Sequence, residues 1–130
     1  MKILAPIDGS DSSFRALRFA SKLAKRFDGS LHVVHISEVE NEATEKIQRR
    51  ANEILEEEDV TDSPEIASDI TLEFRPSNRV GEDILTLVEE EGYDHVVMGH
   101  HGSGTVERAI LGSTTETVIR SDKVPATVVP

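Results

Sequence analysis

The feature that most limits the fold of this chain is a series of short, nearly continuous apolar segments separated by amphipathic ones. Segments such as "LHVVHI" and "DHVVMG" are typical of strands in a parallel sheet that is covered on both faces. The predicted strands span residues 2–7, 31–36, 70–75, 94–99 and 126–129. Between them, apolar residues recur every three or four positions, as in amphipathic helices. The predicted helices span residues 11–27, 80–92 and 114–121, with a strongly charged fourth helix within 38–59.

This alternation predicts an α/β fold in a single domain over residues 1–130. It favours a mostly parallel sheet with right-handed crossovers and helices on both faces, which is a three-layer sandwich. In such sheets a ligand binds beyond the carboxyl ends of the strands, where the strand order reverses. The pattern alone does not say which strands are neighbours. The order 3-2-1-4-5 would place the exits of the first and fourth strands side by side.

The net charge of the chain indicates which kinds of binding partner are unfavourable. Twenty-five acidic and 14 basic residues give a net charge of −11, which disfavours binding to nucleic acids and anionic membranes. No cysteine is present, so disulfides and thiolate metal sites are excluded. No apolar run approaches the roughly 20 residues of a membrane-spanning helix, and "MKILAPID" lacks the apolar region of a signal peptide. We therefore expect a cytoplasmic protein; its five lysines would also suit a salt-rich cytoplasm.

The segment after the fourth predicted strand, "GHHGSGTVERAILGST", is unusually rich in glycine. It is not a Walker A loop, because Gly104 is followed by Thr105 and not by lysine. It is not a dinucleotide-binding fingerprint either, because Glu107 stands where the third glycine belongs. Two interpretations stay open at this point: a flexible surface loop, or a backbone that must come close to an anion.

The spacing that is present is Gly99-x-x-Gly102, nine residues, and then Gly112-Ser113-Thr114. It resembles the nucleotide-binding pattern of the universal stress protein family, G-2x-G-9x-G-[ST], at every fixed position. The similarity extends to "ILAPIDGSDSSFRAL", to "LHVVHI" and to the closing "VPATVV". Only about residues 38–68 carry no particular resemblance. The chain is thus similar to the ATP-binding members of this family.

The resemblance implies a five-stranded sheet in the order 3-2-1-4-5, a Rossmann-like fold similar to the adenine-nucleotide alpha-hydrolases. It implies a homodimer formed through strand 126–129, and bound ATP whose Mg²⁺ is held mainly by the phosphates. The glycines would let the backbone approach the ribose and phosphates, and the first amides of the last helix would face the phosphate charge. The cofactor-binding residues carried over by position are Pro6, Asp8, Ile36, Met98, Gly99, His100, His101, Gly102, Gly104, Gly112, Ser113 and Thr114.

These features predict a homodimeric stress-response or signalling module in which ATP is a structural or regulatory ligand, with an unknown protein partner and no catalytic residues. Phosphoryl transfer normally needs a cationic clamp and an acid that holds Mg²⁺, and here only Arg108 lies near the phosphate-binding segment in sequence. Two alternatives stay open. The first is a slow ATPase or autophosphorylating switch with Ser113 or Thr114 as acceptor. The second is a dimeric interaction module whose pocket is empty or binds another adenylate.

Simpler roles are also open for several of these residues. Ser113 and Thr114 would act as N-caps of the last helix, and Asp8 as a turn former. No metal site is predicted at His100 and His101, because no acidic ligand lies at suitable spacing. The remaining histidines are expected to be hydrogen-bonded residues at the edge of the core, and the serines after the first strand to be helix caps: His32, His35, His95, Ser10, Ser12 and Ser13. Gly29 is expected to end the first helix in the left-handed conformation.

Overall fold

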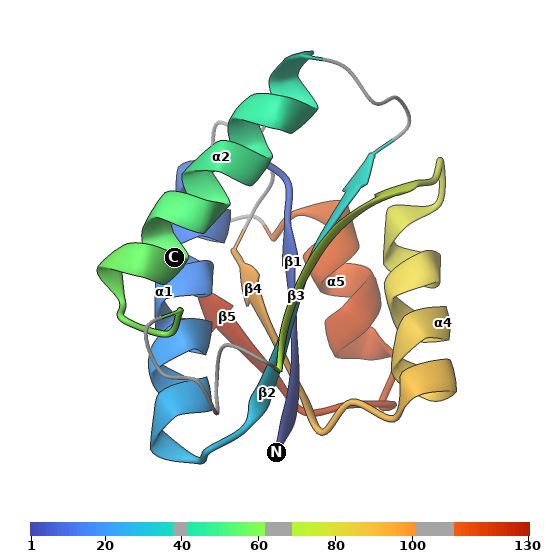
Figure 1. Cartoon of the computed structure of the whole chain (residues 1–130). Helices are drawn as coiled ribbons and strands as arrows, with labels where there is room; N and C mark the ends of the chain where they lie inside the picture. Colours follow the sequence, from blue (N-terminus) through green and yellow to red (C-terminus); the bar gives the residue numbers. More distant parts are fainter. Residues whose placement is uncertain (38–41, 62–68, 101–110) are drawn as a thin grey trace.

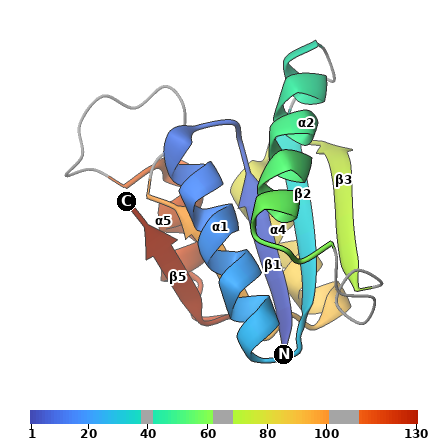
Figure 2. The ribbon, with the colours of Figure 1, turned by 60° about the vertical axis from the view of Figure 1, so that its left-hand side comes forward.

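Five parallel strands form the central layer in the computed structural model, which describes residues 1–37, 42–61, 69–100 and 111–130. The strands are β1 (Lys2–Ile7), β2 (Ser30–Ser37), β3 (Ile70–Pro76), β4 (His95–Gly99) and β5 (Ala126–Val129). The helices are α1 (Asp11–Arg26), α2 (Glu42–Glu57), α4 (Val80–Glu91) and α5 (Ser113–Arg120). The sheet order is β3-β2-β1-β4-β5, with α1 and α2 on one face and α4 and α5 on the other (Figures 1 and 2). The predicted α/β sandwich and its strand order are confirmed.

The central strand β1 supplies side chains to both faces of the sheet. Ile3, Ala5 and Ile7 belong to the apolar core beneath α1 and α2, whereas Leu4 belongs to the core beneath α4 and α5. Successive side chains of a strand point to opposite faces, so a strand covered on both sides must be apolar at nearly every position. This is why the strand segments are almost continuously apolar along the sequence.

The predicted element bounds agree with the structure to within a few residues. The charged helix predicted within 38–59 is α2, which begins at Glu42; residues 38–41 lie outside the described part of the chain. The third strand, predicted over residues 70–75, ends one residue later at Pro76. Gly92 ends α4 as predicted and adopts the left-handed conformation, with φ of 70°.

The prediction for Gly29 is wrong. Asp28 takes the left-handed position after α1, with φ of 47°, and the Gly29 N–H donates to the carbonyl of Ala24 at 2.9 Å. Glycine is required at position 29 for a different reason. A Cβ atom there would lie 2.4 Å from the carbonyl oxygen of Met1, to which the next residue in the chain donates its N–H. Glycine at position 29 therefore allows the backbone to pass close to Met1, and it is not needed to end the helix.

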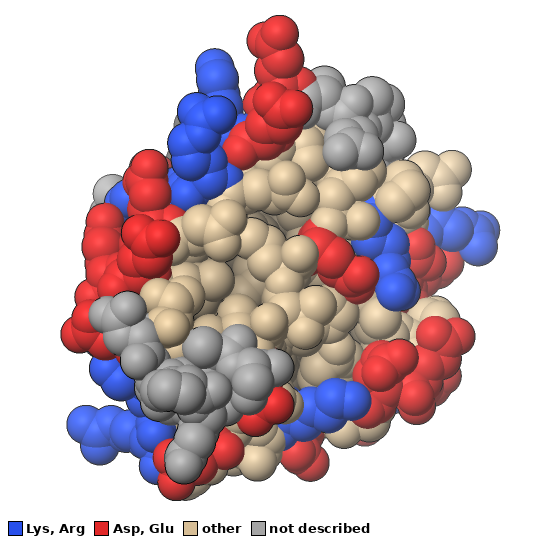
Figure 3. Space-filling model, viewed as in Figure 1, with Lys and Arg blue, Asp and Glu red and all other residues tan. Residues whose placement is uncertain are grey.

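Acidic side chains gather over the outer helices on both sides of the face in Figure 3, with a largely uncharged surface between them. Two of the five lysines pair with acids: Lys123 contacts Glu89, and the Lys2 Nζ lies 3.6 Å from Glu91. Within the described residues, no helix is both long and apolar enough to cross a membrane.

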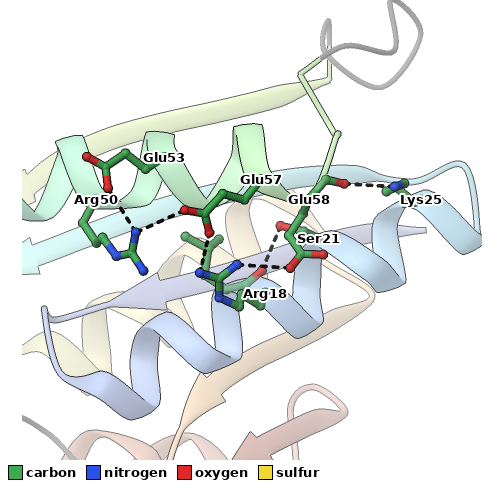
Figure 4. Close-up of polar contacts among 8 residues, drawn as sticks. Arg18, Ser21, Lys25, Arg50, Glu53, Glu57 and Glu58 are labelled. Carbon is green, nitrogen blue, oxygen red and sulfur yellow. Dashed lines mark hydrogen bonds and ion pairs between the residues drawn. The ribbon is translucent and has the colours of Figure 1, made fainter.

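α2 ends in acidic residues, although a helix C-terminus favours cations. Cations from α1 compensate (Figure 4). The Arg18 guanidinium donates to Glu57 at 2.5 Å and to Glu58 at 3.3 Å, and the Lys25 ammonium donates to the carbonyl of Glu58 at 2.9 Å. Arg50 of α2 itself lies 3.4 Å from Glu57. The contacts of Arg18 and Lys25 join the two helices at the surface, whereas the Arg50 contact lies within α2.

The hydrogen bond from Arg18 lowers the pKa of Glu57 below its usual value, and the charges of Arg18 and Arg50 act in the same direction. A carboxyl with a lowered pKa in the folded state stabilises the fold above its unfolded pKa, and this stabilisation is lost as the pH falls through the folded pKa. We therefore expect Glu57→Gln to destabilise the protein near neutrality and to have a smaller effect in acid, as the pH falls through the folded pKa. Urea unfolding of both proteins near neutrality and in acid tests this. An effect of equal size under both conditions would contradict it.

Candidate functional site

The sheet opens between β1 and β4 at the carboxyl ends of its strands. β1 pairs with β2 along its whole length, but its pairing with β4 ends at Leu4↔Val96. The Asp94 N–H donates to the carbonyl of Lys2 at 2.8 Å, so alternate residues of β1 from Lys2 onward turn their backbone toward β4. Pro6 is one of these residues and has no N–H to continue the ladder. The strands therefore part at the point where the strand order reverses, where sheets of this kind bind ligands.

A cavity occupies this opening and collects most of the predicted site. Eight of the predicted residues line it: Pro6, Asp8, Ile36, Met98, Gly99, Gly112, Ser113 and Thr114. His100 is not among the lining residues, and His101, Gly102 and Gly104 lie outside the described residues. Sequence analysis missed five further residues of the lining: Ile7, Ser13, Val80, Ile84 and Thr115.

One side of the cavity is apolar. Val80 and Ile84 lie one turn apart on α4, and they face the opening together with Ile36 of β2 and Met98 of β4. All four belong to the core beneath α4 and α5 or pack against it. A wall of this kind suits a flat apolar or aromatic group of a ligand. The only sequence signal for Val80 and Ile84 was their four-residue spacing, which is equally typical of a helix that faces the core.

The first turn of α5 forms the polar side. Gly112 is the N-cap residue, so the interpretation of Ser113 and Thr114 as N-caps is wrong: they are the first two residues of the helix itself. The first amides of a helix have no acceptor within it, and Gly112 offers no side chain to cap them. Gly112, Ser113 and Thr114 line the cavity, so the positive end of the helix dipole lies there, an arrangement that suits an anion.

The exit of β4 is held close to both flanking helices. The Thr115 hydroxyl donates to the carbonyl of Gly99 at 2.8 Å, and the Gly112 N–H donates to the carbonyl of His100 at 3.0 Å. On the other side, a Cβ atom on Gly99 would lie 2.6 Å from the Ser12 hydroxyl and 2.8 Å from the Ser13 nitrogen. The φ of Gly99 is not left-handed, so glycine is needed there because of this close approach to α1.

Asp8 follows β1 and is both a turn residue and a lining residue of the cavity. The Ser10 N–H donates to its carboxylate at 2.9 Å across Gly9, which has φ of 88°. Of the three serines predicted as caps, Ser10 is the N-cap of α1 and accepts the Ser13 N–H at 3.2 Å. The Asp8 carboxylate is thus oriented by its own loop before any ligand arrives.

Charge at the cavity is sparse. Within the described part of the chain, Asp8 is the one charged residue that lines it. Arg79 lines an adjoining groove that shares Val80, Ser113 and Thr114 with the cavity, and its guanidinium lies 3.3 Å from Glu82. Arg108, the cation predicted from the sequence, lies outside the described residues.

Residues 1–130 match the Universal stress protein family. The chain belongs to this family. The predicted family resemblance is confirmed, and the match spans the whole sequence.

Individual relatives of this universal stress protein agree. One from Methanocaldococcus jannaschii is 30% identical over 146 aligned residues, which cover 98% of the chain and 81% of the relative. A solved universal stress protein in complex with cAMP is 25% identical, with a TM-score of 0.76 and coverage of 100% of this chain and 96% of the other. A universal stress protein from Archaeoglobus fulgidus in complex with dAMP is 20% identical, with a TM-score of 0.74 and coverage of 100% and 98%; this likeness shows the shared fold.

Three histidines of this universal stress protein lie within the sheet, as predicted, and are hydrogen-bonded. The His35 Nδ1 contacts the carbonyl of Ile7 at 2.8 Å, and the His95 Nε2 contacts the Thr127 hydroxyl at 2.7 Å. The His32 ring contacts the Tyr93 hydroxyl through Nδ1 and lies 2.9 Å from Glu73 through Nε2. Burial lowers the pKa of His95, and burial raises the pKa of Tyr93 to about 12. Among the described residues, no three acidic or histidine side chains gather as a metal site would require.

Proposed function

We propose that this universal stress protein binds an adenine nucleotide, with ATP as the preferred ligand, in the cavity between the exits of β1 and β4. The uncapped first turn of α5 carries the proposal, because it directs amides, hydroxyls and a helix dipole at the space where phosphates would lie. The apolar wall of Val80, Ile84 and Met98 would take the base. A related structure in complex with cAMP supports an adenine nucleotide as the ligand class.

The orientation of the ligand follows from the two sides of the cavity. Asp8 and the end of β2 at Ile36 would lie on the adenosine side, and Gly112, Ser113 and Thr114 on the phosphate side. Mg²⁺ would be held mainly by the phosphates themselves, since Asp8 is the one carboxylate among the described lining residues. The glycine-rich segment 99–104 would approach the ribose and phosphates.

We propose that the nucleotide is a structural or regulatory ligand of a signalling module and not a rapidly consumed substrate. Catalysed phosphoryl transfer uses a cationic clamp, a metal-binding acid and a residue that orients the nucleophile. The described lining residues provide Asp8, hydroxyls and helix-end amides. These groups suit binding more than turnover. Slow hydrolysis, or phosphorylation of Ser113 or Thr114, is the second candidate.

The nucleotide carried by the purified protein tests the proposal. We expect that acid denaturation releases close to one ATP per chain, identified by chromatography and mass spectrometry. ADP in its place would favour the slow-ATPase alternative. A protein that releases no nucleotide and shows no thermal shift with ATP and Mg²⁺ would contradict the proposal and favour the interaction module.

We also propose that two copies pair through β5. This strand lies at an edge of the sheet, and its edge backbone groups need a partner. The two helices that contact it, α1 and α5, each carry an exposed large apolar side chain. Phe19, which is 43% exposed, lies one turn after Arg15 on α1, and Arg15 donates to the carbonyl of Pro130 just beyond β5. Ile119, which is 42% exposed, lies on α5 on the opposite face of the sheet. A two-fold copy would cover both side chains.

Light scattering at micromolar concentration is expected to give the mass of a dimer. Phe19→Glu or Ile119→Glu should give a monomer, because each would place like charges across the two-fold axis. Phe27→Glu is the control, since Phe27 is 56% exposed and follows the last turn of α1. A wild-type monomer, or variants that all remain dimeric, would contradict pairing through β5.

A further inference from the structure

His35 stands out among the buried polar residues because of where its hydrogen bond goes. The residue is 5% exposed and lies on β2, directly before Ile36. Since strand side chains alternate, Ile36 faces the cavity and His35 faces the opposite side of the sheet, where its ring centroid lies 5.8 Å from that of Phe74. The Nδ1 atom lies 2.8 Å from the carbonyl oxygen of Ile7, the last residue of β1.

This contact determines which ring nitrogen carries the proton. A carbonyl oxygen can only accept, so Nδ1 of His35 must be the donor. The accepting carbonyl belongs to the peptide that joins Ile7 to Asp8. The N–H of the same peptide faces the Ser13 hydroxyl at 3.4 Å, and the Asp8 carboxylate accepts the Ser10 N–H at 2.9 Å. The peptide that brings Asp8 to the cavity is therefore held on both of its polar sides.

We infer that His35 is a positioning residue of the proposed nucleotide site: its Nδ1–H fixes the Ile7–Asp8 peptide and so orients Asp8 toward the adenosine part of the ligand. The inference rests on the proposed function. His35 does not line the cavity, so it acts through Asp8 and through its chain neighbour Ile36. Its bond joins the exits of β1 and β2, the two strands proposed to contact the adenosine.

A buried histidine can also contribute through packing alone. The variants must therefore distinguish loss of the Nδ1–H hydrogen bond from loss of the packing of the ring. His35→Asn keeps an N–H donor near the position of Nδ1, while His35→Leu fills space without a donor. Phe74→Leu is the matched control, because it disturbs the same layer and leaves the bond to Ile7 intact. Affinities for ATP with Mg²⁺ and for adenosine, measured by calorimetry, are compared with the melting temperature of each variant.

We expect His35→Leu to weaken binding about tenfold, equally for ATP and adenosine, because Asp8 is on the adenosine side. His35→Asn should bind within about threefold of wild type, and Phe74→Leu should lower the melting temperature without changing either affinity. If His35→Leu binds like wild type, or if His35→Asn loses as much affinity as His35→Leu, the inference is overturned. A wild-type protein that binds no adenine nucleotide would instead overturn the proposed function.

Discussion

Replacing Gly99 by alanine is expected to lower the free energy of unfolding by about 3 kcal/mol, at the upper end of what overpacking usually costs. The added Cβ would lie 2.6 Å from the Ser12 hydroxyl, 2.8 Å from the Ser13 nitrogen and 2.9 Å from the Ser12 carbonyl carbon. Two of these three atoms belong to the backbone of the first turn of α1, so a side-chain rotation cannot relieve the contact. Either the helix or the end of β4 must move.

Urea unfolding of Gly99→Ala and of the double variant Ser12→Ala/Gly99→Ala measures this effect. Removing the Ser12 hydroxyl should recover only part of the loss, because both backbone contacts remain. Gly92→Ala is the control: its Cβ would meet nothing within 4 Å, so only its left-handed φ of 70° opposes alanine, at about 1 kcal/mol. A Gly99→Ala protein as stable as Gly92→Ala would mean that α1 shifts at little cost.

The order of strands and helices along the chain was predictable because a strand that is buried on both faces of a sheet is apolar at nearly every position. A segment such as "LHVVHI" is therefore typical of a buried central strand. In the helices between such segments, apolar residues recur with a period of 3.6 residues. The neighbours of each strand leave no such record. The order β3-β2-β1-β4-β5 came from the family resemblance and not from periodicity.

The wrong and missed predictions concern residues whose role depends on a contact with a residue far away in the sequence. Gly29 was assigned to a helix end, although its backbone makes room for Met1. Val80 and Ile84 were not predicted as site residues, because a cavity wall and a core face have the same apolar spacing. His35 was expected to form a hydrogen bond, but the partner could not be predicted. It is a backbone carbonyl 28 residues away, and every residue type has a backbone carbonyl.

Replacing Ser113 by aspartate at the proposed phosphate site is expected to weaken ATP binding without lowering the stability of the fold. The new carboxylate would stand at the first residue of α5, where a negative charge interacts favourably with the helix dipole. The free energy of unfolding should therefore stay unchanged or rise by up to about 1 kcal/mol. The same charge would repel a phosphate about 5 Å away by roughly 3 kcal/mol at an effective dielectric constant of about 20. This corresponds to a loss of ATP affinity of roughly 100-fold.

Thr86→Asp is the matched control, because it adds the same charge at an exposed position of α4 that does not line the cavity. Calorimetry with ATP and Mg²⁺ should give wild-type affinity for this variant and a large loss for Ser113→Asp. Adenosine, which has no phosphate, should bind wild type and Ser113→Asp alike. Equal losses of ATP and adenosine would mean that the carboxylate disturbs the whole cavity. Full retention of ATP binding would place the phosphates away from the first turn of α5, and the uncapped helix end would then have to be explained by the fold alone.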